Sequence, residues 1–215
     1  SDGVPVVGMD NQPPLPVQTR TDRIVQVTIP SVDVLWVIDN SCSMQDEQNS
    51  LTNNFPAFMD YFVGSGLDYH VGVVSTDMDD TSHNGKLRTA SGDKWIDEST
   101  NNPTNAFTTM ANMGTSGSGN EQGIGAGYAA LELKRDTYNS GFLRDSAAMH
   151  AVVISDEEDH TNGDPVTVNE FIGYLQGLKS SPSMVTWSSI VNEPGCCSGF
   201  GDEAPGTKYI DVTNA

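Results

Sequence analysis

The segment that most constrains the fold is a nearly continuous apolar and β-branched run at residues 32–39, VDVLWVID. A strand that is covered on both faces by other elements has this composition, whereas a strand with one face in water alternates apolar and polar residues. We therefore expect residues 32–39 to form a central strand of a sheet that lies between two layers of helices.

Similar strand-like segments alternate along the chain with segments of helical periodicity. Strands are expected at residues 69–76, 149–155 and 184–191. Helices are expected at residues 51–62, 107–113, 121–134 and 168–178, where apolar residues recur three and four positions apart. A short hairpin is expected over residues 87–96. This alternation predicts an α/β fold with a mostly parallel sheet, helices on both faces and right-handed crossovers.

The two ends of the chain differ in composition from the rest. Residues 1–22 contain four prolines and few large apolar side chains, which predicts an extended arm or linker. Residues 24–29 alternate apolar and polar side chains, as an edge strand does. We expect residues 23–215 to form a single domain, with residues 208–215 opening a last helix that continues beyond Ala215.

The charge is strongly acidic, with 29 Asp and Glu against 10 Lys and Arg and a net charge of -19. Such a field repels nucleic acid phosphates and anionic lipid headgroups, so neither is expected as a partner. The longest apolar runs are too short to cross a bilayer, which argues against membrane insertion. The acidic surplus suits cation binding, salt-rich surroundings or solubility alike.

The most informative segment for function is DNSCS, residues 39–43, which begins where the first buried strand ends. In parallel α/β sheets, ligands bind at the carboxyl ends of strands. A sharp turn there would bring the side-chain oxygens of Asp39, Ser41 and Ser43 into one small volume. Carboxylate and hydroxyl oxygens suit a hard cation such as Mg2+, Ca2+ or Mn2+. Two uncharged hydroxyls would leave that ion able to attract an acidic oxygen from a partner.

A buried strand followed by Asp-x-Ser-x-Ser resembles the metal-ion-dependent adhesion site of von Willebrand factor A domains. The resemblance covers residues 32–215 and implies a Rossmann-like, doubly wound sheet wrapped by helices, with the metal at its upper edge. It implies metal-dependent adhesion through one divalent cation, with a partner supplying an acidic oxygen.

The resemblance also implies two further metal-contacting segments. The family has a threonine before a helix of small residues, and here SGSGNEQGIGAGYAAL stands in that place, with Glu121 at the matching position and Asn120 as the alternative. The family's third segment is an Asp directly after the next buried strand, which is Asp156 in VVISDEED. Asp39 and Asp156 are expected to act mainly through water, orienting the groups that complete the coordination.

Simpler interpretations exist for each of these acidic segments. Asp39, Ser41 and Ser43 would also serve as caps of the following helix. Residues 157–159 are expected to be solvated rather than to hold a second cation. The acidic residues 77–80 follow a strand, but no glycine stands where an EF-hand loop requires one.

Three cysteines indicate an oxidising location. Cys42 lies in the metal loop, and Cys196 and Cys197 lie in a loop expected at the same edge of the sheet. We expect a disulfide from Cys42 to one of this pair, with a bridge between Cys196 and Cys197 or three free thiols as alternatives. Together with the acidic surface and the linker-like amino terminus, this predicts an exported bacterial protein, extracellular or attached to the cell surface. The sequence starts at Ser1, so any export signal is expected upstream.

Enzyme signatures are missing from the sequence. It has no complete phosphate-binding loop, no G-x-S-x-G elbow and no HExxH pair, and its four histidines are expected to be ordinary surface or packed residues. The glycines of GIGAG are expected to permit close helix packing. We therefore expect a binding module rather than an enzyme. The alternatives are a scaffold domain of a surface assembly with a purely stabilising cation and, behind it, a metal-assisted hydrolase.

Overall fold

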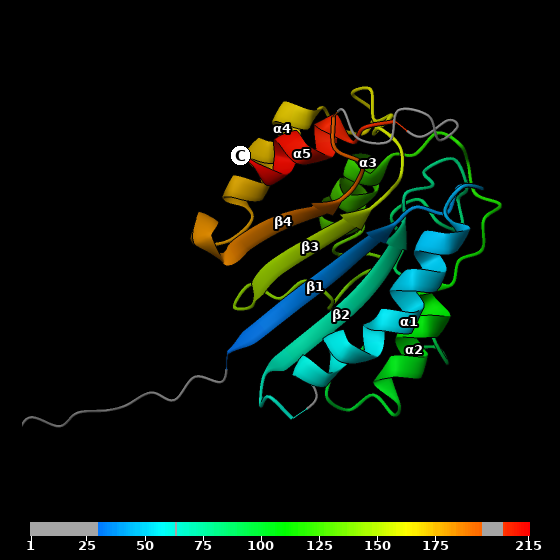
Figure 1. Cartoon of the computed structure of the whole chain (residues 1–215). Coiled ribbons are helices and arrows are strands. Elements are labelled where there is room, and N and C mark those ends of the chain that lie inside the picture. Colours follow the sequence, from blue (N-terminus) through cyan, green and yellow to red (C-terminus); the bar gives the residue numbers. More distant parts are fainter. Residues whose placement is uncertain (1–29, 63, 195–203) are drawn as a thin grey trace, which may run out of the picture.

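The structure, a computed structural model, describes residues 30–62, 64–194 and 204–215. Its centre is a four-stranded sheet in which all pairs are parallel and the strand order is β2-β1-β3-β4 (Figure 1). The strands are β1 (Ser31–Ile38), β2 (Asp68–Ser75), β3 (Ala148–Ile154) and β4 (Val185–Ile190). The predicted parallel α/β sheet is confirmed, and so is the position of residues 32–39 between two other strands.

In the described part of the chain, five α-helices cover the two faces of this sheet (Figure 1). Helices α1 and α2 lie on one face, and α3, α4 and α5 lie on the other. Their bounds are α1 (Gln45–Phe62), α2 (Pro103–Ala111), α3 (Gly123–Tyr128), α4 (Val168–Gly177) and α5 (Thr207–Thr213). Two short turns, the π-helical η1 (Ala129–Leu133) and the 3-10 turn η2 (Pro182–Met184), complete the set. Among the residues described, none of the helices has the length and hydropathy that crossing a membrane requires.

Strand β1 separates two apolar cores because its side chains point alternately to the two faces of the sheet. Val34, Trp36 and Ile38 pack with residues of α1 and α2. Leu35 and Val37 pack with residues of α3, α4 and α5. This explains why the sequence of β1 is apolar at successive positions rather than at every second one.

Two predicted elements differ from the structure. Residues 87–96 form a turn closed by an antiparallel bridge between Ala90 and Asp93, and Ile96 bridges to Val71 of β2, but no strand forms on either arm in this described segment. The helix predicted at residues 121–134 starts two residues later and changes from α- to π-helical hydrogen bonding after Tyr128. The predicted arm at residues 1–22 and the strand at residues 24–29 lie outside the described residues.

The starting ends of β1 and β2 are joined by Arg144. Its guanidinium Nε donates to Asp33 Oδ1 at 2.8 Å, its backbone N–H donates to Asp33 Oδ2 at 2.7 Å, and it also pairs with Asp68.

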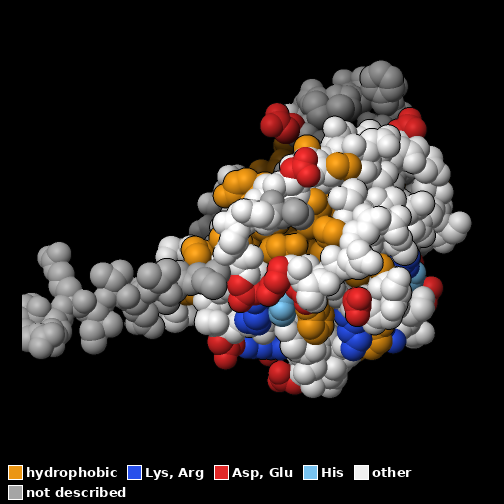
Figure 2. All heavy atoms as spheres, turned by 90° about the horizontal axis from the view of Figure 1, so that it is seen from below, with side chains coloured by type: hydrophobic (Ala, Val, Ile, Leu, Met, Phe, Trp, Pro, Cys, Tyr) orange, Lys and Arg blue, Asp and Glu red, His pale blue; other side chains and the backbone are white. Residues whose placement is uncertain are grey.

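On the face seen in Figure 2, acidic, basic and histidine side chains lie side by side next to a group of hydrophobic ones. The net charge of -19 is therefore not spread as a uniform acidic coat.

Glycines let α3 approach its neighbours closely, as the sequence predicted. A Cβ atom at Gly123 would lie 2.7 Å from the hydroxyl oxygen of Tyr209 in α5, and one at Gly127 would lie 3.2 Å from the ring of Trp187 in β4. Tyr209 is fully buried, and its hydroxyl accepts a hydrogen bond from the Gly123 N–H at 3.2 Å. The position of α3, and of the loop just before it, thus depends on this small residue.

We expect Gly123→Ala to lower the free energy of unfolding by about 1–3 kcal/mol, because the added methyl group has no space beside Tyr209. Urea denaturation would measure the change. The matched control is Gly173→Ala in α4, where a Cβ atom meets nothing within 4 Å. That variant should be neutral or up to about 1 kcal/mol more stable, since alanine favours helix. Equal effects of the two variants would contradict the packing role of Gly123.

Candidate metal site

Three loops meet at the carboxyl end of the sheet. One follows β1 and carries Asp39, Ser41 and Ser43; a second leads into α3 and carries Glu121; the third follows β3 and carries Asp156. Hydrogen bonds join them: Ser155 in the third loop donates to Asp39, and the His160 N–H donates to the Glu121 carbonyl oxygen at 2.7 Å. The three segments singled out from the sequence therefore lie at one edge of the sheet.

Asp39 is fully buried and held by hydrogen bonds at both carboxylate oxygens. Its Oδ1 accepts from the Ser41 N–H at 2.8 Å, and its Oδ2 accepts from the Ser155 hydroxyl at 2.6 Å. Its carbonyl oxygen accepts from Gln48 Nε2 at 2.9 Å. Asp39 is thus fixed in place to orient its loop, which agrees with the indirect role expected from the resemblance.

The turn after Asp39 brings the two serine hydroxyls together. Ser41 Oγ and Ser43 Oγ lie 3.2 Å apart, with Ser41 buried and Ser43 exposed. Within the described part of the chain, the Ser41 and Ser43 hydroxyls bond to each other, and the Asp39 carboxylate accepts from the Ser41 backbone N–H and the Ser155 hydroxyl; none of these side chains bonds to the first turn of α1. This pattern favours convergence of their oxygens over the capping alternative.

Glu121 is the most unusual residue of the site. Its side chain is fully buried, and neither Oε1 nor Oε2 has a hydrogen-bond partner among the described residues. Antiparallel bridging to Asp77 fixes its backbone. The neighbouring Asn120 is only half-buried, so the structure favours Glu121 over that alternative. A buried carboxylate without partners is costly and needs an explanation, for which a bound cation is sufficient.

Asp156 presents a third unsatisfied oxygen at the same edge. It is 7% exposed, and its Oδ1 is buried without a hydrogen-bond partner in the described part of the chain. Its carbonyl oxygen accepts from Asn192 Nδ2 at 2.9 Å, which joins the loop after β3 to the end of β4. Carboxylate and hydroxyl oxygens such as those of Glu121, Asp156, Ser41 and Ser43 are the ligands that hard divalent cations prefer, and a cation held jointly by these four residues stays a prediction.

Burial and neighbouring charges raise the pKa of two carboxyl groups in this site. Burial, together with the charges of Asp39 and Glu157, raises the pKa of Glu121 to about 8. Burial raises the pKa of Asp39 to about 6, against the hydrogen bonds from Ser155 and Ser41 and with the charge of Asp156. A cation would relieve this repulsion and the desolvation of the ionised groups together.

Residues 157–159 were expected to be solvated, and this expectation is wrong for Asp159, while Glu157 and Glu158 are half-buried. Asp159 is fully buried; its Oδ2 accepts from the Ile124 N–H at 2.9 Å and its Oδ1 from the Thr161 N–H at 2.8 Å. Glu158 accepts from the backbone N–H groups of Thr207 and Lys208 at the start of α5. Acidic side chains in this loop are therefore used to hold α3 and α5, because free N–H groups at helix starts need acceptors.

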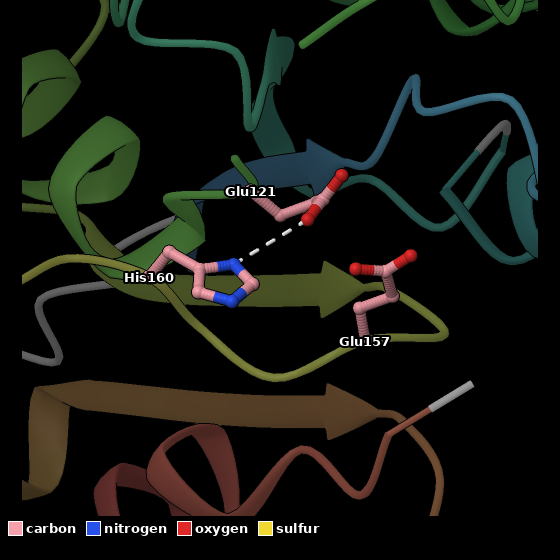
Figure 3. Close-up of side chains that lie close together, drawn as sticks. All are labelled: Glu121, Glu157 and His160. Carbon is pink, nitrogen blue, oxygen red and sulfur yellow. Dashed lines mark ion pairs between the residues drawn. The ribbon is translucent and has the colours of Figure 1, made fainter. Parts of the chain in front are cut away.

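His160 is a further departure from the sequence-based expectation. It was expected to be ordinary, yet its Nδ1 lies 3.5 Å from Glu121 Oε2, and Glu157 faces the same carboxylate (Figure 3). Motif searches miss it because it pairs with a residue 39 positions earlier. Its place four residues after Asp156, in a loop at the carboxyl end of a strand, is the signal that points to it.

The other acidic and cysteine predictions have different outcomes. Asp77 Oδ1 accepts from the backbone N–H groups of Asp79 and Asp80, and its Oδ2 accepts from Ser118, which indicates a turn-forming role. Cys42 is exposed and has no disulfide partner among the described residues. Cys196 and Cys197 lie outside those residues, so the disulfide stays a prediction.

Comparison with known proteins supports the fold alone. No protein-family model and no curated protein matches the sequence. Two crystal structures of proximal thread matrix protein 1 from the mussel byssus are similar, with TM-scores of 0.53 and 0.51 and identities of 15% and 12%. Each alignment covers 86% of this chain but only 41% or 39% of the mussel chain. This chain thus spans about two fifths of the length of the mussel protein.

A pilus adhesin, SpaC from Lactobacillus rhamnosus GG, aligns more weakly. The match covers 62% of this chain and 15% of the adhesin, with 12% identity and a TM-score of 0.39, which is too low to indicate a shared fold. The α/β architecture agrees with the one that the von Willebrand factor A resemblance implies, and membership of that family stays a prediction.

In the metal-free chain, we expect the free energy of unfolding to fall as the pH rises from about 4 to about 8. The folded state holds the protons of Asp39 and Glu121 more tightly than the unfolded state does, so their contribution is fully present below their ordinary pKa values. It is lost as the pH rises through the higher values of the folded state. Urea denaturation in the presence of EDTA at several pH values would measure this slope.

Glu121→Gln should flatten the upper part of this window, between about pH 6 and 8. The control is Glu98→Gln, which changes an exposed glutamate and should leave the slope as it is. A slope that Glu121→Gln leaves unaltered would show that this carboxylate is not the titrating group.

Proposed function

We propose that this chain is a divalent-cation-dependent binding domain that acts outside the cell. The observation that carries the proposal is the fully buried Glu121 carboxylate, which has no hydrogen-bond partner in the described residues and lies at the sheet edge where the Asp39 and Asp156 loops meet. The cation would be held by Ser41, Ser43, Glu121 and Asp156. Asp39 would orient the loop after β1 that carries Ser41 and Ser43, which is called the serine loop below. The cation would supply a positive centre that attracts an acidic oxygen of a partner.

The arrangement of the residues supports a site that is fixed in place and open to a partner. Asp39, which is the carboxylate nearest to the serine hydroxyls in sequence, accepts a hydrogen bond at each oxygen, from Ser41 and from Ser155, and these bonds hold the loop in place. Ser43 is exposed, so the site opens to solvent on the side of the loop after β1. A partner can therefore approach the site without rearrangement of the sheet.

A scaffold role is the second candidate, and one comparison favours it. The mussel protein of similar fold is named as a thread matrix protein, so a domain of this architecture occurs in a matrix protein there. In a scaffold, internal side chains would fill the coordination sphere of the cation and no partner oxygen would enter it. The two roles thus differ in whether a coordination position stays open.

We expect Ser41→Ala combined with Ser43→Ala to abolish stabilisation by Mg2+, Ca2+ or Mn2+ while leaving the fold intact. A cation at a hundredfold excess over its Kd stabilises the native state by about 2.7 kcal/mol. For a domain of this size that corresponds to a rise in Tm of roughly 5–10 °C. Thermal melting followed by circular dichroism, with cation and with EDTA, would measure it.

A matched control pair exists in the same chain. Ser181 Oγ and Ser183 Oγ lie 2.9 Å apart with the same spacing in sequence, but on an exposed turn. Ser181→Ala with Ser183→Ala should keep the full cation-dependent shift. The site assignment fails if the Ser41 and Ser43 pair can be removed without loss of this shift.

An open coordination position can be tested with acetate. On the Mn2+-loaded chain, we expect acetate to lower the water proton relaxivity because its carboxylate displaces coordinated water. Acetamide, which has the same shape but no charge, should have little effect. Relaxivity that is low at the outset and insensitive to acetate would favour the scaffold role instead.

A further inference from the structure

A second group of possible ligands lies at the same end of the sheet. None of its residues belongs to the serine loop. Glu121, Glu157 and His160 each offer one ligand atom, and these atoms lie within 4.8 Å of one another (Figure 3). Glu121 comes from the loop before α3, and the other two come from the loop after β3. Their side chains point toward a common centre in the close-up.

The polar atoms at this centre are not satisfied by the described residues. Glu121 is fully buried with two unpartnered oxygens, and the buried Nδ1 of His160 also has no hydrogen-bond partner. The 3.5 Å between Nδ1 and Glu121 Oε2 is longer than a good hydrogen bond, and the carboxylate of Glu157 adds a second acid to the group. When the imidazole is neutral, no positive charge lies between these two carboxylates and the ring, and a bound cation would supply one.

The backbone around these residues is firmly held, so the group is preorganised. The His160 N–H donates to the Glu121 carbonyl oxygen at 2.7 Å, which ties the two loops together between the proposed ligands. The Glu157 N–H donates to Ser155 Oγ at 3.2 Å, and the buried Asp159 is fixed by its bonds to Ile124 and Thr161. A ligand set on such a support can bind an ion without reordering the loops.

We propose that Glu121, Glu157 and His160 form a second cation site, selective for a borderline metal of the zinc class. Imidazole nitrogen with two carboxylates suits Zn2+ better than Mg2+, Ca2+ or Mn2+, which prefer oxygen ligands. This second site would hold a metal separate from the cation of the proposed function, and Glu121 would be the one residue that both sites share. Three protein ligands leave a position open to solvent on the side of His160, whose side chain is 43% exposed.

The test uses the full chain and Co2+ as an optical probe, because nitrogen coordination changes the visible absorption of Co2+. The Ser41→Ala/Ser43→Ala variant should still bind one equivalent of Co2+ and of Zn2+, measured by absorption and by isothermal titration calorimetry. His160→Gln should weaken Zn2+ binding at that site at least about tenfold. The double serine variant should lose the Mg2+-dependent rise in Tm and keep this Zn2+ binding, so the failure of the present proposal can be distinguished from the failure of the proposed function.

His83→Gln is the matched control. His83 also has one carboxylate neighbour, Asp80 at 4.0 Å, but no third ligand group joins them in the described part of the chain. This variant should bind Co2+ and Zn2+ as the wild type does. Glu157→Gln should weaken Zn2+ binding while the thermal unfolding of the metal-free chain stays cooperative.

Two results would overturn the proposal. One is Zn2+ affinity that is equal in the wild type and in His160→Gln. The other is a His160 ring whose nitrogen resonances in ¹⁵N-edited spectra do not move on addition of Zn2+. Either would show that His160 and Glu121 form an ion pair without a metal between them.

Discussion

Burial of carboxyl groups is the constraint around which the carboxyl end of this sheet is built. The loops after β1 and β3 and before α3 bring Asp39, Glu121 and Asp156 to this end because the carboxyl ends of parallel strands meet at one edge. Among the described residues, donors reach both oxygens of Asp39 but neither oxygen of Glu121. The fold therefore buries carboxyl oxygens that its own described donors do not satisfy, which is a common property of cation sites and a rare property of ordinary cores.

The neighbouring polar residues keep this arrangement in place. Ser155 reaches from the end of β3 to the Asp39 carboxylate, and Asp159 reaches from the same loop to the start of α3. Lys208 Nζ donates to the Asp159 carbonyl oxygen, and the Tyr209 hydroxyl accepts from Gly123. These contacts connect α5 to the loop that carries Glu157 and His160, so the site and the last described helix form one packed unit.

The fold was predictable from sequence because each buried strand carries its own signal. The apolar run of β1 and the periodicity of α1 and α4 are local patterns, and they gave the right element types and order. Asp39, Ser41, Ser43 and Asp156 could be found because they stand directly after such strands. His160 and Ser155 could not be ranked from sequence alone, because their importance depends on partners 39 and 116 positions away. The predicted hairpin at residues 87–96 does not form, because Ile96 bridges to Val71 of β2 instead of pairing with the other arm of the turn.

Gln48 in α1 limits which sequences can preserve this architecture. Its single side-chain nitrogen donates to two carbonyl oxygens, that of Asp39 at 2.9 Å and that of Gly114 at 3.0 Å, and the residue is buried. Only a neutral amide offers two N–H groups on one nitrogen at this length. A glutamate would place lone pairs against both carbonyls, and a lysine would bury a charge. An amide at this helix position thus joins α1 to the loop after β1 and to Gly114, a structural requirement that the short Asp-x-Ser-x-Ser pattern does not contain.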